Sequence, residues 1–301
     1  MSGLVDPADE RLDVRVVRDY GLSRRRAQEA IAAGQVDVAG IRVRDAGRRV
    51  TPDVIVLYDA NRRREEGVRL SLPVAFQDET LAVVDKPAGL LSVPTDGAGA
   101  RDDSVLTRLR ADLEHVRGRG AYVGALHRLD RGTSGLLAVA LSRECHAAGR
   151  AAFRDHAYVR IYLAIVEGSP RKASGTIDLP IADEYESGRR HIAHDDDEPS
   201  RRAVTHYRTI ERFQKAALLE LELDTGRQHQ IRLHLRAIGH PIVGDGVYGR
   251  KEHANSRPLL HASKLNFPHP LTRAPIACVA EPPRDFEDAL RRLRRGAAGR
   301  R

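Results

Sequence analysis

The sequence predicts an α+β protein that consists of a small N-terminal α/β module and one long second domain. Three observations support this class. The 301 residues suffice for about two domains of roughly 150 residues each. Segments with apolar residues at helical spacing alternate with segments of period two. A charged stretch, NRRREEGVRL, separates two apolar-patterned regions and is typical of a linker.

The predicted N-terminal module spans residues 1–60. Its clearest element is a helix within residues 22–35, which has Ser23 as N-cap and Gly34 at its end. The inner stripe of this helix is apolar and consists of Ala27, Ala30 and Ile31. Short alternating segments follow up to residue 58 and favour a small hairpin. The module is therefore compact and mixes helices with short strands.

Residues 61–71 form the predicted linker, and residues 72–286 form the second domain. The alternation of patterns predicts strands at residues 80–87, 158–168 and 216–223 and helices at residues 104–116, 142–157 and 227–238. Ser142 is the expected N-cap of the second of these helices. The segment 189–202 is polar and predicts a loop or hairpin.

The apolar pattern also predicts which side chains are buried. In the strand at 158–168, Tyr162 is expected to lie on the face opposite the aliphatic core. The residues expected to face that core are Val159, Ile161, Leu163 and Ile165. In the other segments the expected core residues are Val105, Leu109, Leu113, Val116, Leu219, Leu221, Leu223, Ile231, Leu235 and Ile238.

Charge and cysteine content restrict the class of protein. The formal charge is +8, but the last dozen residues carry six arginines and no acidic residue, so they leave only +2 for the rest. We expect this C-terminal tail (287–301) to be a frayed basic helix or disordered. Two cysteines, no signal peptide and no apolar run long enough for a membrane helix predict a cytoplasmic protein without disulfides.

Several familiar site motifs are missing from the sequence. His229 and His234 are five residues apart, not the four that place two ligands on one helix face. The sequence contains neither a Walker lysine motif nor a dinucleotide-binding glycine motif, and GTSG around Ser134 does not match a nucleophile elbow. His191, His194 and the acidic residues 195–197 favour an exposed loop. We therefore expect no metal and no cofactor.

Three residue positions remain as candidates for chemistry. Asp130 lies in a glycine-framed bend between Arg128 and Arg131, just before an aliphatic run that predicts a buried strand. Tyr162 and Arg232 lie opposite the expected core faces of their elements. A carboxylate, a phenol and a guanidinium in one cleft suit nucleophilic or acid–base work. Taken singly, Asp130 is better explained as an ion-pair partner, Tyr162 as a core aromatic and Arg232 as a surface cation.

The motif HRLDRGTSGLL at residues 127–137 resembles the signature of RluA-type pseudouridine synthases. Further blocks resemble this family in the expected order over residues 72–283: FQDETLAVVDKPAGLLSVP, RIYLAIVEG, PIADEYESGRRHIAHDDDEPSRRAVTHYR, LDTGRQHQIRLHLRAIGHPIVGDGVYG and LLHASKLNFPHP. The resemblance implies a long mixed, mostly antiparallel sheet with a central catalytic cleft. It departs from the family at Arg160, where lysine is frequent, and at Ser200 and Arg201, which replace a Gly-Lys pair.

The N-terminal segment RLDVRVVRDYGLSRRRAQEAIAAGQVDVAG resembles the small RNA-binding domain named after ribosomal protein S-four. Arg24, Arg25 and Arg26 lie at a predicted helix N-terminus, where backbone N–H groups also favour anions. A solvated face is the simpler explanation of these arginines. The resemblance instead implies that they contact RNA.

The family resemblance assigns roles to individual residues. Asp130 corresponds to the essential aspartate, which either attacks the anomeric carbon or promotes glycal formation. Tyr162 would stack on the base and take the proton from carbon 5, and Arg232 would pair with Asp130. Arg128 would enter the RNA stack vacated by the flipped uridine, and Leu260 would pack near the base.

The resemblance thus implies an RNA pseudouridine synthase that acts as a monomer on ribosomal RNA, with transfer RNA as the other candidate substrate. Two rivals stay open: a catalytically silent RNA-binding or ribosome-assembly factor, and a nucleoside hydrolase-like enzyme. The presence of Asp130, Tyr162 and Arg232 argues against the first rival. The single carboxylate argues against the second, because a glycosidase pairs two.

Overall fold

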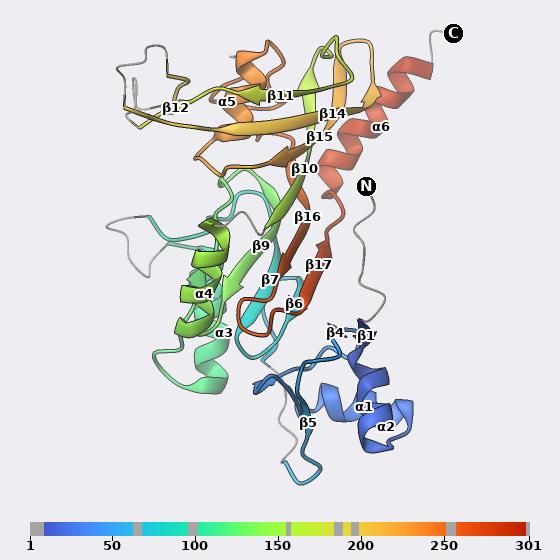
Figure 1. Cartoon of the computed structure of the whole chain (residues 1–301). Coiled ribbons are helices and arrows are strands. Elements are labelled where there is room, and N and C mark those ends of the chain that lie inside the picture. The colour runs from blue at the N-terminus through green and yellow to red at the C-terminus, as the bar shows by residue number, and fades with distance from the viewer. Residues whose placement is uncertain are drawn as a thin grey trace.

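The computed structural model describes residues 9–62, 68–95, 102–154, 158–183, 189–193, 199–250 and 257–298. Residues 63–67 of the predicted linker, His194 with the acidic residues 195–197, and the last three residues lie outside these ranges. Figure 1 shows a long sheet domain with the N-terminal module at one end. Within the described ranges, no helix is both long and apolar enough to cross a membrane.

The N-terminal module packs two helices against short strands. Its elements are β1 (Glu10–Arg11), α1 (Leu12–Tyr20), α2 (Arg24–Ala32), β2 (Val36–Val38), β3 (Ile41–Arg42), β4 (Arg49–Val50) and β5 (Val56–Tyr58). Ser23 caps α2 by accepting a hydrogen bond from the Arg26 backbone N–H. The predicted inner stripe of α2 is confirmed, because Ala27, Ala30 and Ile31 are buried in the core of the module.

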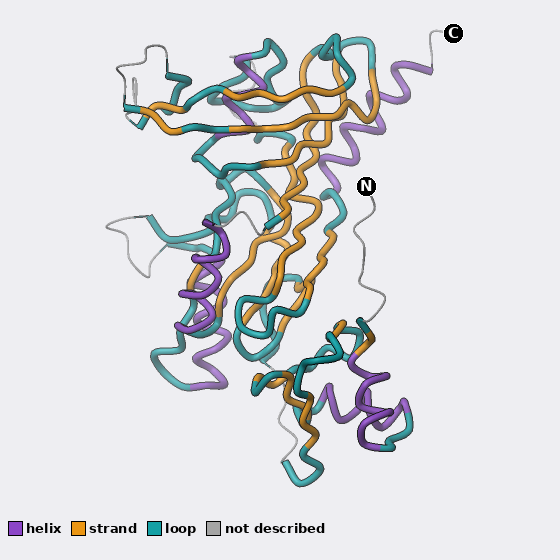
Figure 2. The backbone as a smooth tube through the Cα atoms, viewed as in Figure 1, coloured by secondary structure: helices purple, strands orange, loops and turns teal. Residues whose placement is uncertain are grey.

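The second domain is built on one ten-stranded sheet with the order β11-β14-β15-β10-β16-β9-β7-β6, in which β17 also pairs with β16 and β8 with β9. Figure 2 shows its strands in orange running through the domain. Its strands are β6 (Val74–Gln77), β7 (Leu81–Lys86), β8 (Gly124–Ala125), β9 (Ser134–Ala140), β10 (Val159–Glu167), β11 (Ser174–Asp178), β14 (Val204–Arg212), β15 (Ala216–Leu223), β16 (Leu260–Pro268) and β17 (Pro275–Val279). Among the described strands of this sheet, β9 and β16 pair in parallel and the other pairs are antiparallel, which confirms the expected mixed, mostly antiparallel sheet.

Helices cover both faces of this sheet. They are α3 (Val105–Arg117), α4 (Arg143–Arg154), α5 (Gln230–Ala237) and α6 (Arg284–Ala298). Ser142 caps α4 as predicted, since its Oγ accepts a hydrogen bond from the Cys145 N–H. The predicted core residues of α3 are buried except Val116, which lies at the exposed C-terminal turn. Ile238 is half-buried, just beyond the end of α5.

The predicted core face of β10 is wrong. The main core contains Tyr162, whereas Val159 is exposed and Ile165 belongs to a second cluster on the other face. Both faces of the strand are partly buried, because α5 contributes to the main core and α6 covers the second cluster. The alternation of side chains along a strand identifies which residues share a face. When both faces are covered, it cannot tell which of them packs against the main core.

The C-terminal segment is neither frayed nor disordered up to residue 298. Helix α6 crosses the predicted domain boundary at residue 286 and buries Phe286, Ala289 and Leu290 against the sheet, while its arginines face solvent. An amphipathic helix of this kind is stabilised by its apolar stripe, which the density of arginines obscures in the sequence. The division of the chain at residues 60, 71 and 286 stays a prediction.

A buried ion pair joins the N-terminal module to the sheet domain. Arg48 of the module lies 3.0 Å from the Asp78 carboxylate and also donates to the Thr272 hydroxyl. The His269 ring lies 3.0 Å from the same carboxylate, and the guanidinium stands over the Phe76 ring. Because Arg48 and Asp78 are almost fully buried, these contacts fix where the module sits on the sheet.

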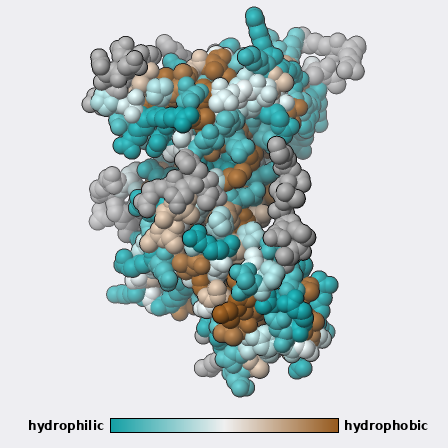
Figure 3. Space-filling model, viewed as in Figure 1, coloured by the Kyte–Doolittle hydropathy of each residue, from teal (hydrophilic) through white to brown (hydrophobic). Residues whose placement is uncertain are grey.

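A second hairpin extends from the far end of the sheet. It pairs β12 (Ile181–Ala182) with β13 (Ser200–Arg201). Of the predicted loop or hairpin at residues 189–202, residues 194–198 lie outside the described ranges, so this assignment stays a prediction. Figure 3 shows that most of the visible surface is hydrophilic, with apolar patches that include part of the N-terminal module.

Candidate functional site

Asp130 lies in the bend between β8 and β9, as its sequence context predicts. The Thr133 N–H donates to the Asp130 carbonyl at 3.0 Å and closes the bend. Just before it, Ser92 Oγ donates to the Leu129 carbonyl at 2.7 Å and accepts from the Leu129 N–H at 3.0 Å. The Asp130 side chain remains 22% exposed. The bend thus holds a partly exposed carboxylate just before the fully buried strand β9.

Gly135 allows this bend to lie against β16. Its φ is +110°, and a Cβ built there would come within 2.3 Å of the Ala262 carbonyl oxygen. Any other residue would push β9 away from β16. Because the two strands run in parallel from Ser134 and His261, the Asp130 bend lies at the same end of the sheet as the start of β16, Leu260.

Arg232 of α5 connects Asp130 to a second carboxylate. Its Nη1 donates to Asp130 Oδ2 at 3.1 Å, while Nε and Nη2 donate to the two oxygens of Asp245 at 2.7 and 2.8 Å. Asp245 Oδ1 also accepts from the N–H groups of Val247 and Tyr248, both at 3.0 Å. Arg232 is 7% exposed and Asp245 only 1%. Arg232 is therefore a buried group, not a surface cation.

Burial and ion pairing shift the pKa values of Arg232 and Asp245 in opposite directions. Burial lowers the pKa of Arg232, but the hydrogen bonds and charge of Asp245, with a smaller contribution from Asp130, raise it overall. Burial likewise raises the pKa of Asp245, and its bonds to Arg232 lower it overall. Both groups therefore stay charged at neutral pH. Their charges largely cancel, so Asp130 contributes the exposed negative charge of the trio.

His229 and Tyr248 border the same trio; sequence reasoning considered His229 only as a metal ligand and missed Tyr248. His229 Nε2 lies 3.9 Å from Asp130 Oδ1, and its Nδ1 is 2.7 Å from the Tyr248 hydroxyl. The Tyr248 ring lies 4.8 Å from the Arg232 guanidinium carbon. Burial lowers the pKa of His229, so the ring is neutral at pH 7. His229 also has a left-handed backbone (φ +60°), which costs a non-glycine residue energy.

Tyr162 and Leu260 lie on one face of the sheet. Tyr162 of β10 pairs with Ala262 and Ala164 pairs with Leu260, so the two side chains are diagonal neighbours on the same face. Both are buried in the main core. Burial raises the pKa of Tyr162, while the positive charge of Arg160 opposes this shift. The phenol is therefore protonated at neutral pH.

A buried lysine supports the other side of the bend. The Lys86 Nζ donates to the carbonyls of Pro87, Leu90 and Arg131 at 3.0, 2.8 and 3.3 Å. Burial lowers its pKa to about 8, although the charge of Asp130 opposes this shift. The motif DKPAG gave no sign in the sequence that its lysine would be enclosed. Lys86, at the end of β7, thus connects Arg131 of the bend to the segment that follows β7.

The remaining predicted site residues lie outside the trio. Arg128 is exposed and forms no ion pair with Asp130 among the described residues, and Arg131 instead donates to the Gly89 carbonyl. Arg24, Arg25 and Arg26 are exposed on the N-terminal module. Arg24 contacts Asp13 at 3.3 Å and Arg25 contacts Glu29 at 2.9 Å. Among the described residues, no cluster of three or more His, Cys, Asp or Glu is placed to hold a metal.

Comparisons with known proteins match both parts of the chain. Residues 80–237 match the family model described as RNA pseudouridylate synthase, and residues 10–56 match the S4 domain. The ribosomal large subunit pseudouridine synthase D of Zymomonas mobilis is 36% identical over 288 residues, 88% of either chain. An uncharacterized RNA pseudouridine synthase of Synechocystis is 34% identical over 91% of this chain and 85% of its own. The solved structure of human RNA pseudouridylate synthase domain containing 4 has a TM-score of 0.61 at 25% identity and covers 74% of this chain and 93% of that one.

Proposed function

Because the chain belongs to the RNA pseudouridylate synthase family, we propose that it isomerises uridine in large-subunit ribosomal RNA with Asp130 as its catalytic residue. Family membership makes the chain an isomerase that acts on RNA, and the S4 domain adds an RNA-binding module. The name of the relative from Zymomonas mobilis supports the ribosomal substrate. Transfer RNA is the alternative. We further propose that the chain acts as a monomer and in the cytoplasm, where ribosomal RNA is present.

The observation that carries the catalytic assignment is the trio of Asp130, Arg232 and Asp245. Arg232 holds Asp130 Oδ2 at 3.1 Å, and Asp245 holds Arg232 in place from behind. Asp130 Oδ1 is then the oxygen available to the ribose of a bound uridine. A charged carboxylate fixed by buried partners is preorganised for the developing positive charge at the anomeric carbon.

The reaction requires only this one carboxylate. The bond between N1 and the anomeric carbon breaks, the bond from C5 to that carbon forms, and the proton lost from C5 is balanced by one gained at N1. Asp130 either attacks the anomeric carbon or assists loss of the neighbouring ribose proton to give a glycal. No water is consumed, so the second carboxylate of a glycosidase has no role.

Tyr162 and Leu260 are proposed to hold the uracil ring. They are diagonal neighbours on one face of β10 and β16, next to the bend that contains Asp130. The raised pKa of Tyr162 keeps its phenol protonated at neutral pH, so the phenol is not a ready base. We therefore assign Tyr162 the role of stacking on the uracil ring before that of accepting a proton. Accepting the C5 proton requires that the phenol give up its own proton during the reaction.

Arg128 and the module arginines are proposed to bind the RNA outside the reacting uridine. Arg128 is exposed two residues before Asp130, where it can fill the space that a flipped base leaves. Flipping costs a few kcal/mol, which an inserted planar cation would offset. Arg24, Arg25 and Arg26 are exposed at the start of α2 and can reach phosphates.

The Asp130→Asn variant tests the assignment against a catalytically silent RNA-binding factor. It preserves shape, removes the charge and leaves the S4 domain unchanged. Tritium release from RNA labelled at C5 of uracil should vanish, and RNA affinity measured in parallel should persist. Full activity in this variant would remove Asp130 from the mechanism. An inactive unmodified chain on every cellular RNA would favour the silent factor.

A further inference from the structure

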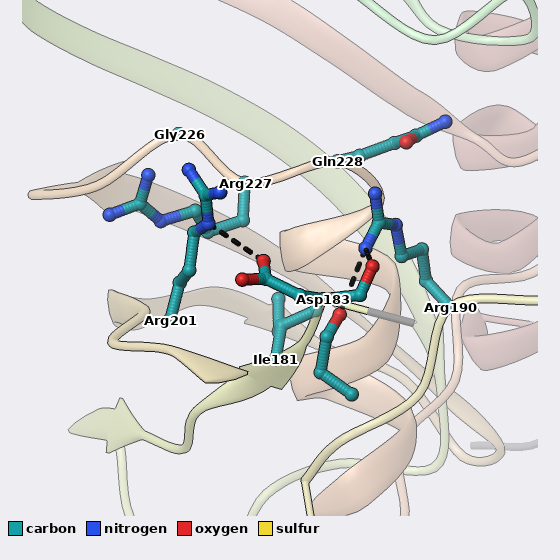
Figure 4. Close-up of a pocket in the computed structure, with 8 residues that line it drawn as sticks. Ile181, Asp183, Arg190, Arg201, Gly226, Arg227 and Gln228 are labelled. Carbon is teal, nitrogen blue, oxygen red and sulfur yellow. Dashed lines mark hydrogen bonds and ion pairs between the residues drawn. The ribbon is translucent and has the colours of Figure 1, made fainter. Parts of the chain in front are cut away.

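A basic pocket of about 400 Å³ lies beside the active site. One wall comes from the β12–β13 hairpin, with Ala182 and Arg201. The other comes from residues 226–228, which immediately precede α5. Figure 4 shows Arg201 and Arg227 side by side at one edge, Arg190 at the opposite edge and Asp183 between them.

The charges of this pocket favour an anion. Among the described residues that line the pocket, Arg190, Arg201 and Arg227 face one carboxylate, Asp183, so the formal balance of these four groups is +2. Arg190 is fixed to the wall, because its Nη1 donates to the carbonyls of Ala182 and Asp183. A positive group that is already immobilised loses little conformational entropy when an anion binds.

The other two arginines can turn toward a ligand. Arg201 is 62% exposed and contacts Asp183 through Nε at 2.7 Å, and an exposed pair of this kind is worth little. Arg227 donates to the Arg202 carbonyl through Nε at 3.2 Å, which leaves its two Nη groups for an anion. Guanidinium groups bind phosphate through two parallel hydrogen bonds.

The position of the pocket identifies which anion reaches it. Residues 226–228 continue directly into His229, whose Nε2 lies 3.9 Å from Asp130 Oδ1. Successive Cα atoms are about 3.8 Å apart, so Arg227 is at most two such steps from His229. A phosphate a few nucleotides from a uridine bound at Asp130 is therefore within reach of the pocket.

We propose that this pocket binds a backbone phosphate of the substrate RNA a few nucleotides from the target uridine. This inference rests on the proposed function, because it places the uridine at Asp130. In the free protein, Asp183 holds Arg201 in the position that the phosphate later requires. When RNA binds, the phosphate replaces Asp183 as the partner of Arg201, and Arg227 closes on the same phosphate.

The test measures RNA binding as a function of salt in the Asp130→Asn background, with an in vitro transcript of large-subunit ribosomal RNA as the probe. The double variant Arg201→Ala/Arg227→Ala should bind roughly tenfold more weakly at low salt. Its slope of log affinity against log salt should be shallower by about 0.7, since both arginines contact one phosphate and each single-strand phosphate contact contributes about 0.7.

The matched control is Arg208→Ala/Arg236→Ala, which removes the same charge outside the pocket. Arg208 is 63% exposed and pairs with Glu220 at 2.7 Å, much like Arg201 with Asp183. The control should change the slope by less than half as much. Equal losses in the two double variants would overturn the proposal, because they would show a general effect of net charge.

The Asp183→Asn variant should change RNA affinity in the direction opposite to Arg201→Ala/Arg227→Ala. It removes the competing anion, so RNA should bind more tightly, whereas a damaged fold would weaken binding. Arg201→Lys/Arg227→Lys should recover most of the salt slope, since the charge is kept. Weaker binding in Asp183→Asn, with an unchanged unfolding midpoint, would contradict the displacement of Asp183 by a phosphate.

Phosphate-ethylation interference locates the contact on the RNA. One interfering phosphate near the modified uridine should disappear in the Arg201→Ala/Arg227→Ala variant, and an unchanged pattern would overturn the proposal. Tritium release by the chain with Asp130 intact is assayed on the same transcript. If that release is absent while the pocket-dependent salt slope persists, the ribosomal assignment fails and the phosphate site stands.

Discussion

Removing the charge of Asp245 should lower both the stability of the protein and its catalytic rate, although Asp245 does not touch the reacting groups. The Asp245→Asn change keeps the shape but replaces one carboxylate oxygen with an amide that cannot accept the Arg232 Nε hydrogen bond, now 2.7 Å long. Arg232 then remains buried with Asp130 as its charged partner. Breaking a buried pair from one side costs about 3–5 kcal/mol.

That loss should lower the thermal unfolding midpoint on the order of 10 °C, as 1 kcal/mol shifts the midpoint of a domain of this size by about 2–4 °C. Catalysis should also fall, because Arg232 no longer has two fixed anchors when it positions Asp130. A displacement of about 1 Å at a reacting group can cost roughly 100-fold in rate. Calorimetry and single-turnover tritium release measure the two effects.

Asp285→Asn is the matched control. Asp285 also receives two hydrogen bonds from one guanidinium, that of Arg257, but its side chain is 55% exposed. An exposed pair contributes about 0.2–1 kcal/mol, so this variant should shift the midpoint by only a few degrees. If Asp245→Asn were no more destabilised than the control and kept full activity, the argument that a buried second carboxylate positions Arg232 would be wrong.

Four further expectations follow from the contacts described above. Arg48→Ala leaves Asp78 buried with a weaker partner, so it should destabilise the protein by about 3 kcal/mol and expose the segment between the two domains to limited proteolysis; unchanged cleavage would mean that the module is held by other contacts. The lowered pKa of Lys86, about 8 against 10.5, means that below pH 8 both folded and unfolded states carry its proton and the destabilisation is complete. As pH rises from 8 to 10.5 the folded state releases the proton first, so unfolding free energy should increase by about 3 kcal/mol relative to Lys86→Met; parallel urea-unfolding curves for the two proteins would contradict this. Arg128→Ala should slow modification of a structured stem-loop more than that of an unpaired uridine, and equal slowing would place Arg128 in the chemistry. Arg26→Ala should weaken RNA binding and make its salt slope shallower by roughly one unit, whereas an unchanged slope would mark a solvated side chain.

The sequence by itself determined the local elements, because their signals lie within a few residues. Ser23 and Ser142 cap the helices that they were expected to begin, and β15 buries the alternate residues that its pattern indicates. The run after Asp130 forms the fully buried strand β9. The motif around Asp130 and the order of the other blocks also sufficed for the family, which the comparisons confirm.

The tertiary structure decided which partners these elements meet. Two covered faces made the core side of β10 unpredictable from its alternation, and the arginines of α6 concealed its apolar stripe. The family resemblance implied that Arg232 pairs with Asp130, but the contact joins residues 102 positions apart and no local pattern in the sequence indicates it. Asp245 and the basic pocket emerge only when distant loops meet, since ion pairs depend on distance in space and not on separation along the chain.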